Sequence, residues 1–135
     1  MVIVKATPET EAGVLPTTEE LTAMGRFNEE LVKAGMMLAG DGLKPSSKGA
    51  RIRYSAGKPT VTDGPFTEAK ELVAGFWLIQ AKSKDEVVEW LKRAPFEDAE
   101  VEIRPLYEAE DFGESLTPEL RDAEEKLRAQ AASNR

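Results

Sequence analysis

The stretch LVAGFWLIQA, at residues 72–81, constrains the fold of this chain more than any other part of the sequence. It is the most hydrophobic stretch, and it is too short and too rich in strand-forming residues for a helix, so it predicts a central strand. Successive side chains of a strand point to opposite faces of a sheet. Both sets are apolar here: Val73, Trp77 and Ile79 share one face, and Ala74, Phe76 and Leu78 share the other. The sheet must therefore be covered on both faces.

The sequence on either side of this strand predicts the rest of a small domain. Thr17 and Glu20 have the spacing of a capping box, and Gly35 offers a C-terminal stop for the helix that they begin. Residues 7–16 break all periodicity and are expected to be irregular. In chain order, the predicted elements are a strand at residues 1–6, a helix at 17–34, a strand at 36–40, a β-hairpin across 51–62, the central strand, a helix from Ser83 to Pro95 and a strand at 101–105.

This order matches a ferredoxin-like α+β sandwich with an inserted β-hairpin. Two helices cover only one face of such a sheet. Because the second face is also apolar, we expect a second copy of the chain to cover it in a two-fold homodimer. After the domain, an acidic linker leads to a helix that begins at Thr117-Pro118 and carries a narrow apolar stripe. We therefore divide the chain into a domain at 1–108 and a C-terminal helical extension at 109–135.

The absence of histidine and cysteine excludes several kinds of chemistry. A Ser-His-Asp triad, a cysteine nucleophile, an imidazole or thiolate zinc site and a histidine-bound haem all need residues that this chain lacks. Proton transfer must then fall to a carboxylate, a lysine, a tyrosine, water or the substrate itself. The sequence has no phosphate-loop or dinucleotide-binding glycine pattern, so we expect neither a metal nor a cofactor.

The charge balance bears on partners and location. The chain has 18 Lys and Arg against 25 Asp and Glu, and this net charge of −7 disfavours a nucleic-acid partner. No stretch approaches the roughly 20 apolar residues that span a bilayer. The first residues lack the basic and apolar regions of a signal peptide. We expect a cytoplasmic protein without a membrane partner.

Several spaced motifs resemble one known family. The sequence DGPF at 63–66, followed by TEAKE at 67–71 and by the strand VAGFWLI, resembles the signature of the DGPF-motif branch of the YCII-related family. GDGL at 40–43 and VEIRPL near the end of the domain fit the same pattern in order, so the resemblance covers residues 1–106. The later EDFG segment is similar to a tail of some relatives. The resemblance implies a ferredoxin-like sandwich that pairs into a dimeric α/β barrel.

The resemblance also implies two kinds of function. Some YCII relatives are lyase-like enzymes that act on small organic molecules, and DGPF members are associated with regulation through extracytoplasmic-function sigma factors. The YCII branch has a His-Asp pair, whose histidine lies about eleven residues before the glycine that ends the first helix. Counting back from Gly35 places Met24 there, so the pair is absent and its mechanism does not transfer to this chain.

Two aspartates are the candidate catalytic residues. Asp63 lies in a turn at the end of a predicted strand, near several bases and an aromatic residue. A turn aspartate also caps its own backbone, and this structural role is the alternative. Asp41 has a glycine on each side and ends the second strand. If the fold brings Asp41 close to Asp63, the two carboxylates split their pKa values and one can carry a proton.

The predicted hairpin carries the candidate ligand-binding cations. Residues 42–62 contain five bases and no acid, and Arg51 and Arg53 share one face of their strand. An arginine pair binds a carboxylate or phosphate in bidentate fashion, so the pattern favours a small anionic ligand. The alternative is an exposed hairpin whose charges limit edge-to-edge pairing.

The DGPF turn supplies the remaining candidate ligand-binding residues. Gly64 and Pro65 shape the turn, and Phe66 serves either as a core residue or as a ligand-stacking ring. Lys70 is either an acid-base partner or an exposed charge. The predicted cleft lies near Asp63, Arg53 and Lys70.

Three functional hypotheses follow. The first is a dimeric small-molecule-binding or regulatory module. The second is a lyase or isomerase that uses carboxylate-mediated proton transfer on a small organic substrate. The third is an interaction module whose acidic tail helix docks on a regulatory protein partner. Because the histidine of the YCII pair is missing, the sequence does not decide whether the chain is an enzyme.

Overall fold

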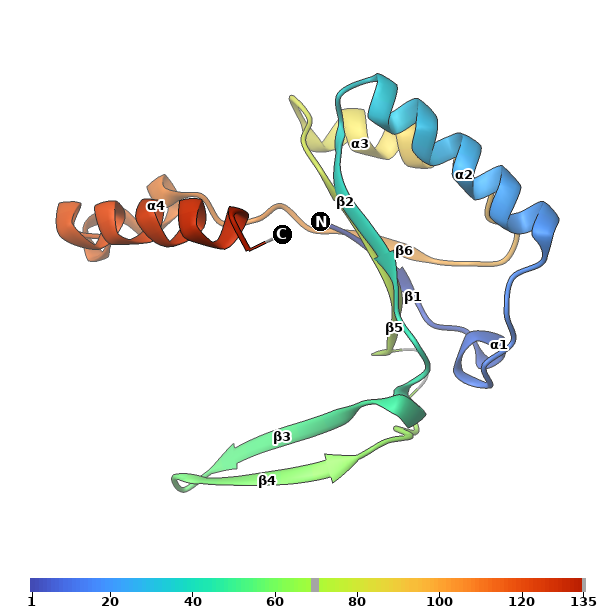
Figure 1. Cartoon of the computed structure of the whole chain (residues 1–135), viewed down its shortest axis with the longest axis horizontal. Coiled ribbons are helices and arrows are strands. Elements are labelled where there is room, and N and C mark those ends of the chain that lie inside the picture. Colours follow the sequence, from blue (N-terminus) through green and yellow to red (C-terminus); the bar gives the residue numbers. More distant parts are fainter. Residues whose placement is uncertain (69–70, 135) are drawn as a thin grey trace. The chain divides into compact units, whose positions relative to one another are not determined.

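The computed structural model describes residues 1–68 and 71–134, which form two compact units, Met1–Arg104 and Pro105–Arg135. In the first unit (Figure 1), the elements are β1 (Val2–Lys5), α1 (Pro8–Glu11), α2 (Thr18–Lys33), β2 (Met37–Gly42), the 3-10 helix η1 (Ser46–Lys48), β3 (Ala50–Ser55), β4 (Lys58–Asp63), β5 (Val73–Ile79), α3 (Lys84–Leu91) and β6 (Val101–Ile103). The second unit contains the 3-10 helix η3 (Ala109–Ser115) and α4 (Pro118–Ala132).

Four strands form an antiparallel sheet in the order β2-β5-β1-β6. The hydrophobic strand β5 lies between β1 and β2, so the prediction of an inner strand is confirmed. The short strand β6 pairs only with β1 and ends at Ile103, two residues before Pro105, which suits a proline next to a sheet edge. This mixed α+β arrangement is consistent with a ferredoxin-like fold.

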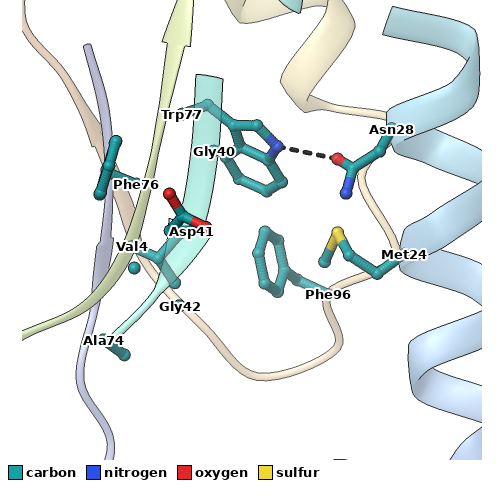
Figure 2. Close-up of a pocket in the computed structure, with 11 residues that line it drawn as sticks. Val4, Met24, Asn28, Gly40, Asp41, Gly42, Ala74, Phe76, Trp77 and Phe96 are labelled. Carbon is teal, nitrogen blue, oxygen red and sulfur yellow. Dashed lines mark hydrogen bonds between the residues drawn. The ribbon is translucent and has the colours of Figure 1, made fainter. Parts of the chain in front are cut away.

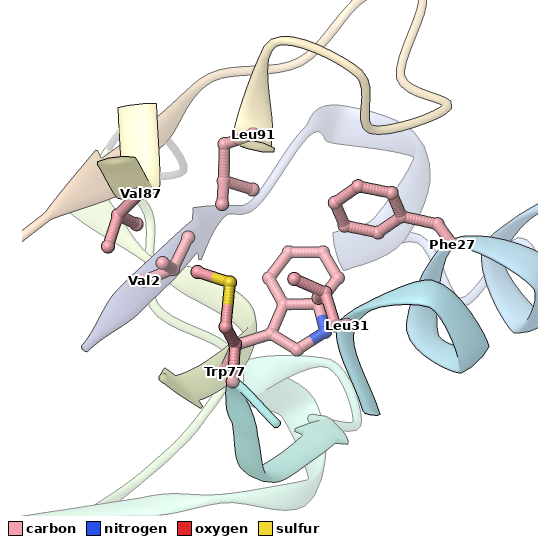
Figure 3. Packing of buried hydrophobic residues seen from close by; sticks show 7 residues of the cluster. Val2, Phe27, Leu31, Trp77, Val87 and Leu91 are labelled. Carbon is pink, nitrogen blue, oxygen red and sulfur yellow. The ribbon is translucent and has the colours of Figure 1, made fainter. Parts of the chain in front are cut away.

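The register of the sheet separates its two faces. Val2 pairs with Trp77 on β5 and with Ile103 on β6, so these three side chains share a face. Ile3 pairs with Phe76, and both therefore lie on the opposite face. Helices α2 and α3 pack on the Val2 face (Figure 1). The buried core consists of Val2, Phe27, Leu31, Met36, Trp77, Val87 and Leu91 (Figure 3).

The ends of α2 follow the signals in the sequence. Thr17 and Glu20 form a reciprocal capping box, which supplies partners to backbone N–H groups that the first turn leaves free. At the other end, Gly35 has a φ of 72°, a left-handed conformation that glycine adopts without strain. Leu31 and Phe27 face the sheet because they lie four residues apart on one side of the helix.

The second sheet-packing helix, α3, ends earlier than its sequence suggests. The Ser83 hydroxyl accepts a hydrogen bond from the Glu86 N–H, as its N-cap position predicts. The α-helix stops at Leu91 rather than at Pro95, and the Ala94 N–H instead bonds to the Leu91 carbonyl in a tighter turn. In a continued helix, the ring of Pro95 would clash with the carbonyl of Leu91, four residues earlier, and Pro95 has no N–H to bond to it, which accounts for the early end.

The segment expected to be irregular and the acidic linker both contain short helices. The segment at 7–16 contains α1, which Thr7 and Thr10 cap reciprocally and which has Pro8 at its first position. The linker before α4 contains η3, a run of 3-10 helix with a break at Gly113. Both are too short to show a helical period, so only their caps were readable in the sequence. The start of α4 at Thr117-Pro118 is confirmed.

Strands β3 and β4 form a separate two-stranded antiparallel sheet. They are joined by Ala56 and Gly57, whose φ values of 49° and 76° match the type I′ turns that suit tight hairpins. Among the helices in the described residues, none combines the length and the apolar composition that a membrane span needs.

Candidate functional site

A cavity of about 370 Å³ lies between α2 and the strands β2 and β5 (Figure 2). Helix α2 contributes Met24 and Asn28 to its wall, and the segment after α3 contributes Phe96. The lining residues are Val4, Met24, Asn28, Gly40, Asp41, Gly42, Ala74, Gly75, Phe76, Trp77 and Phe96. The cavity therefore lies between the helix layer and the four-stranded sheet.

Three glycines form the sheet side of this cavity. Gly40 pairs with Trp77 and Gly42 pairs with Gly75, so all three glycines lie on the helix-covered face. A Cβ atom on Gly40 would come within 2.8 Å of Met37 Cε and 3.0 Å of Trp77 Cδ1, so this position is closely packed. A Cβ atom on Gly42 would meet nothing within 4 Å. Open space remains above the sheet because no side chain rises from these positions.

Trp77 and Asn28 form the one side-chain hydrogen bond between two lining residues that the described part of the chain shows (Figure 2). The indole Nε1 of Trp77 donates a hydrogen bond of 2.8 Å to Oδ1 of Asn28. The same indole meets the rings of Phe27 and Phe96 edge-on, with centroid distances of 5.9 and 6.1 Å. Such contacts fix the orientation of the indole ring, so Trp77 forms a fixed part of the cavity wall between β5 and α2.

Asp41 is the one candidate catalytic residue that borders this cavity. It pairs with Phe76, and strand alternation places its side chain on the face opposite Trp77. Its backbone carbonyl oxygen lies beside Gly75, because a Cβ atom on Gly75 would come within 3.1 Å of it. Asp41 therefore borders the cavity through its backbone, whereas its exposed carboxylate belongs to the other face.

Asp63 lies elsewhere in the first unit. It is exposed, it ends β4 and it pairs with Ala50 in the two-stranded sheet. Among the described residues, the lining of the cavity includes Asp41 but not Asp63. The predicted pairing of the two carboxylates therefore has no counterpart in this cavity.

The DGPF turn is tied to η1 by backbone contacts. The Gly64 N–H donates to the Gly49 carbonyl at 3.0 Å, and the Phe66 N–H donates to Ser46 Oγ at 3.0 Å. A Cβ atom on Gly64 would lie 1.8 Å from the Ser46 carbonyl oxygen, so only glycine fits this turn. Pro65, the next residue, is exposed.

Ser46 extends this connection to α1. Its N–H and its hydroxyl both donate to the carboxylate of Glu11. These two hydrogen bonds, with the hydroxyl bond the larger effect, hold the pKa of Glu11 below its usual value. Glu11, Ser46 and Phe66 therefore join three segments that are distant in the sequence.

One of the two candidate arginines of the hairpin, Arg51, has partners within the chain. The guanidinium carbon of Arg51 lies 3.9 Å from the centroid of the Phe66 ring, and its Nη1 lies 3.7 Å from Glu68 Oε2. Arg51 and Arg53 pair with Thr62 and Thr60, so both arginines lie on one face of the hairpin. Lys70 lies outside the described residues.

Sequence reasoning missed most of this cavity. The sequence identified Met24 only as the position of the missing histidine and Trp77 only as a residue of the central strand, and Asn28 and Phe96 were not singled out. The position that the family resemblance gives to a histidine is Met24, and it lines the same cavity as Asp41. The available signal was the set of glycines on β2 and β5, which becomes informative only when the strand register is known.

Metal ligands are not clustered in the described part of the chain, where no group of three or more acidic side chains could hold an ion. The second unit has a smaller pocket of about 240 Å³ beside the neighbouring rings of Tyr107 and Phe112. An ion pair of 2.8 Å between Glu124 and Arg128 borders that pocket. Residues of the C-terminal helical extension therefore contact one another through this ring pair and this ion pair.

Comparison with known proteins places the chain in a family. The model of the YCII-related domain matches residues 1–110. An uncharacterized protein of Rhizobium meliloti (strain 1021) is 38% identical over 90 residues, which are 64% of this chain and 70% of that relative. The matched region includes every strand and helix of the first unit. The chain belongs to the YCII-related family.

Proposed function

We propose that this YCII-related protein is a small-molecule-binding module and that its ligand occupies the cavity between α2, β2 and β5. The observation that carries the proposal is the volume of about 370 Å³ above three glycines. Ligand pockets in proteins have volumes of about 300–1,000 Å³, and this cavity, which is open to solvent, falls within that range. The size of the cavity suits a compact ligand.

The residues of the cavity support binding rather than proton transfer. Asp41 is the only ionisable residue among the described lining residues, and its carboxylate belongs to the opposite face of the sheet. A carboxylate-mediated lyase or isomerase needs an acid or base within reach of its substrate. The cavity instead offers apolar rings, a thioether and one side-chain amide.

Ligand binding is tested by titration of the purified protein with acetophenone, benzoate and cumene. Occupancy is read from the indole N–H signal of Trp77, which is distinguished from that of Trp90 by the Trp90→Phe variant. The proposal predicts that at least one probe shifts the Trp77 signal in a saturable way. If none of the three shifts it, the cavity is not a binding site for molecules of this size.

A cavity-filling variant gives an independent test. Gly42→Leu places a side chain into open space on the cavity side, so it should weaken binding by at least about tenfold without preventing folding. The matched control is Gly25→Leu, because Gly25 is exposed on α2 and a Cβ atom there also meets nothing within 4 Å. Equal affinity in both variants would place the ligand elsewhere.

We also propose that two copies pair through the open face of the sheet, as in a dimeric α/β barrel. Ile3, Phe76 and Leu78 share this face by register, whereas α2 and α3 pack on the other. Leu78→Lys should shift the sedimentation coefficient from that of a dimer to that of a monomer. The control is Leu127→Lys on the exposed stripe of α4, which should leave the dimer intact. A monomeric unaltered protein would refute the pairing.

The DGPF turn supports membership of the DGPF-motif branch, and we propose a structural role for its glycine and phenylalanine. Gly64 allows the backbone of Ser46 to approach closely, and the Arg51 guanidinium lies over the Phe66 ring in a cation-π contact. Binding of a small anion by Arg51 and Arg53 remains a prediction from the sequence. Titration with inorganic phosphate tests it, because binding that is lost in the Arg53→Gln variant would place an anion there.

A further inference from the structure

Asn28 sets the hydrogen-bonding character of the cavity. An indole N–H can only donate, so the Asn28 atom at 2.8 Å from Trp77 Nε1 must be the acceptor oxygen. This fixes the orientation of the amide. Its Nδ2 atom, with two N–H donors, then points away from Trp77 and toward the space beside Met24 and Phe96 (Figure 2).

Apart from Asn28, the described lining residues offer few polar groups that could bond to a ligand. Gly75 belongs to the inner strand β5, which pairs with β2 on one side and with β1 on the other, and backbone groups of an inner strand bond to those of its neighbours. Met24 has a weakly accepting thioether and Phe96 has no polar side-chain atom. The side chains therefore present donors at Asn28 and apolar surface around it.

The charge of the wall limits which acceptor fits. Lysine and arginine are absent from the described lining residues. A carboxylate or phosphate in the cavity would meet no positive side chain among these lining residues, so the hydration that it loses on binding is not offset by a counter-charge. An uncharged carbonyl oxygen would receive the Asn28 hydrogen bond with a much smaller loss of hydration.

We propose that the cavity selects compact, uncharged molecules that have an apolar or aromatic body and a carbonyl-type oxygen, which accepts a hydrogen bond from Asn28 Nδ2. This inference rests on the proposed function, because it names the ligand class of the same cavity. The aromatic body lies against Trp77, Phe96 and Met24, where ring and thioether contacts are favourable.

Three probes of similar size separate the features of the ligand. Acetophenone has a neutral carbonyl oxygen, benzoate has a charged acceptor, and cumene has no acceptor. Titration calorimetry on the full-length protein should give an affinity for acetophenone about tenfold or more above the other two. Benzoate or cumene binding as tightly as acetophenone overturns the inference but leaves the proposed function standing. If none of the three binds, both fall.

The Asn28→Asp variant tests the role of the amide directly. The aspartate retains an oxygen for the Trp77 N–H but loses both donors, so acetophenone affinity should fall about tenfold while cumene affinity stays within about twofold. Unchanged acetophenone affinity would contradict the assignment. The three-probe comparison needs only the unaltered protein, so it decides the question even if this variant does not fold.

Discussion

Substitution of Gly64 by alanine tests whether the DGPF turn is held by its backbone contact with η1. The new Cβ atom would lie 1.8 Å from the Ser46 carbonyl oxygen and 2.6 Å from the Ser46 carbonyl carbon. Ordinary van der Waals contact begins at 3.4 Å, so the two segments must separate by about 1.6 Å. Both are backbone atoms, and a rotamer change cannot relieve the clash.

The separation breaks two hydrogen bonds, from Gly64 N–H to the Gly49 carbonyl and from Phe66 N–H to Ser46 Oγ. At about 1 kcal/mol for each bond, Gly64→Ala should lower the free energy of unfolding by about 2 kcal/mol. The measurement is urea unfolding followed by tryptophan fluorescence, with amide hydrogen exchange at residue 66 to detect local loosening of the turn.

Gly49→Ala is the matched control for this variant. Its Cβ atom would lie 3.6 Å from the same Ser46 oxygen, which is an ordinary contact, and its φ of −111° suits alanine. It should change the free energy of unfolding by less than about 0.5 kcal/mol. A Gly64→Ala protein that matches this control in both stability and amide exchange would refute the proposed role of the turn.

Three further substitutions test other parts of the structure. Glu11→Gln removes a carboxylate whose pKa is lowered by its hydrogen bonds from Ser46. The variant should therefore be less stable than the unaltered protein above pH 4.5, and this difference should disappear as the pH falls below the pKa of Glu11 in the folded protein. A difference that does not depend on pH would count against the hydrogen bonds between Ser46 and Glu11. Gly40→Ala should lower the free energy of unfolding, measured with urea, by about 1–3 kcal/mol, because its Cβ atom meets Met37 and Trp77 at 2.8 and 3.0 Å. An unchanged free energy would mean that the sheet side of the cavity is loosely packed at Gly40. Leu31→Ala, at a fully buried position, should cost about 2–5 kcal/mol, whereas Val32→Ala at a 59% exposed position should cost less than about 1 kcal/mol; similar losses would contradict the burial pattern.

The sequence predicted those parts of the fold that leave a local pattern. The alternation in β5 identified an inner strand, and Thr17 with Glu20 marked the start of α2, because each signal lies within a few residues. The short helix α1 was missed, since four residues are too few to show a helical period. The early end of α3 was missed because the effect of Pro95 extends back into the preceding turn.

The candidate site was much less predictable. Asp63 attracted attention because it lies in a turn near bases, but the contacts of that turn with Ser46 join residues 20 positions apart. The cavity depends on glycines from β2 and β5 that face α2 only in the observed register. Asn28 looks like any polar residue of a helix until its contact with Trp77, 49 positions away, fixes its amide. Long-range pairing created the site, and local sequence patterns do not encode such pairing.

The position of a bound probe tests the central claim most directly. In a solution of the labelled protein with acetophenone, intermolecular nuclear Overhauser effects report which side chains lie beside the ligand. Binding in the cavity predicts effects between acetophenone and the Met24 methyl group and the Phe96 ring. Effects confined to hairpin residues such as Tyr54, or none at saturating acetophenone, would contradict it.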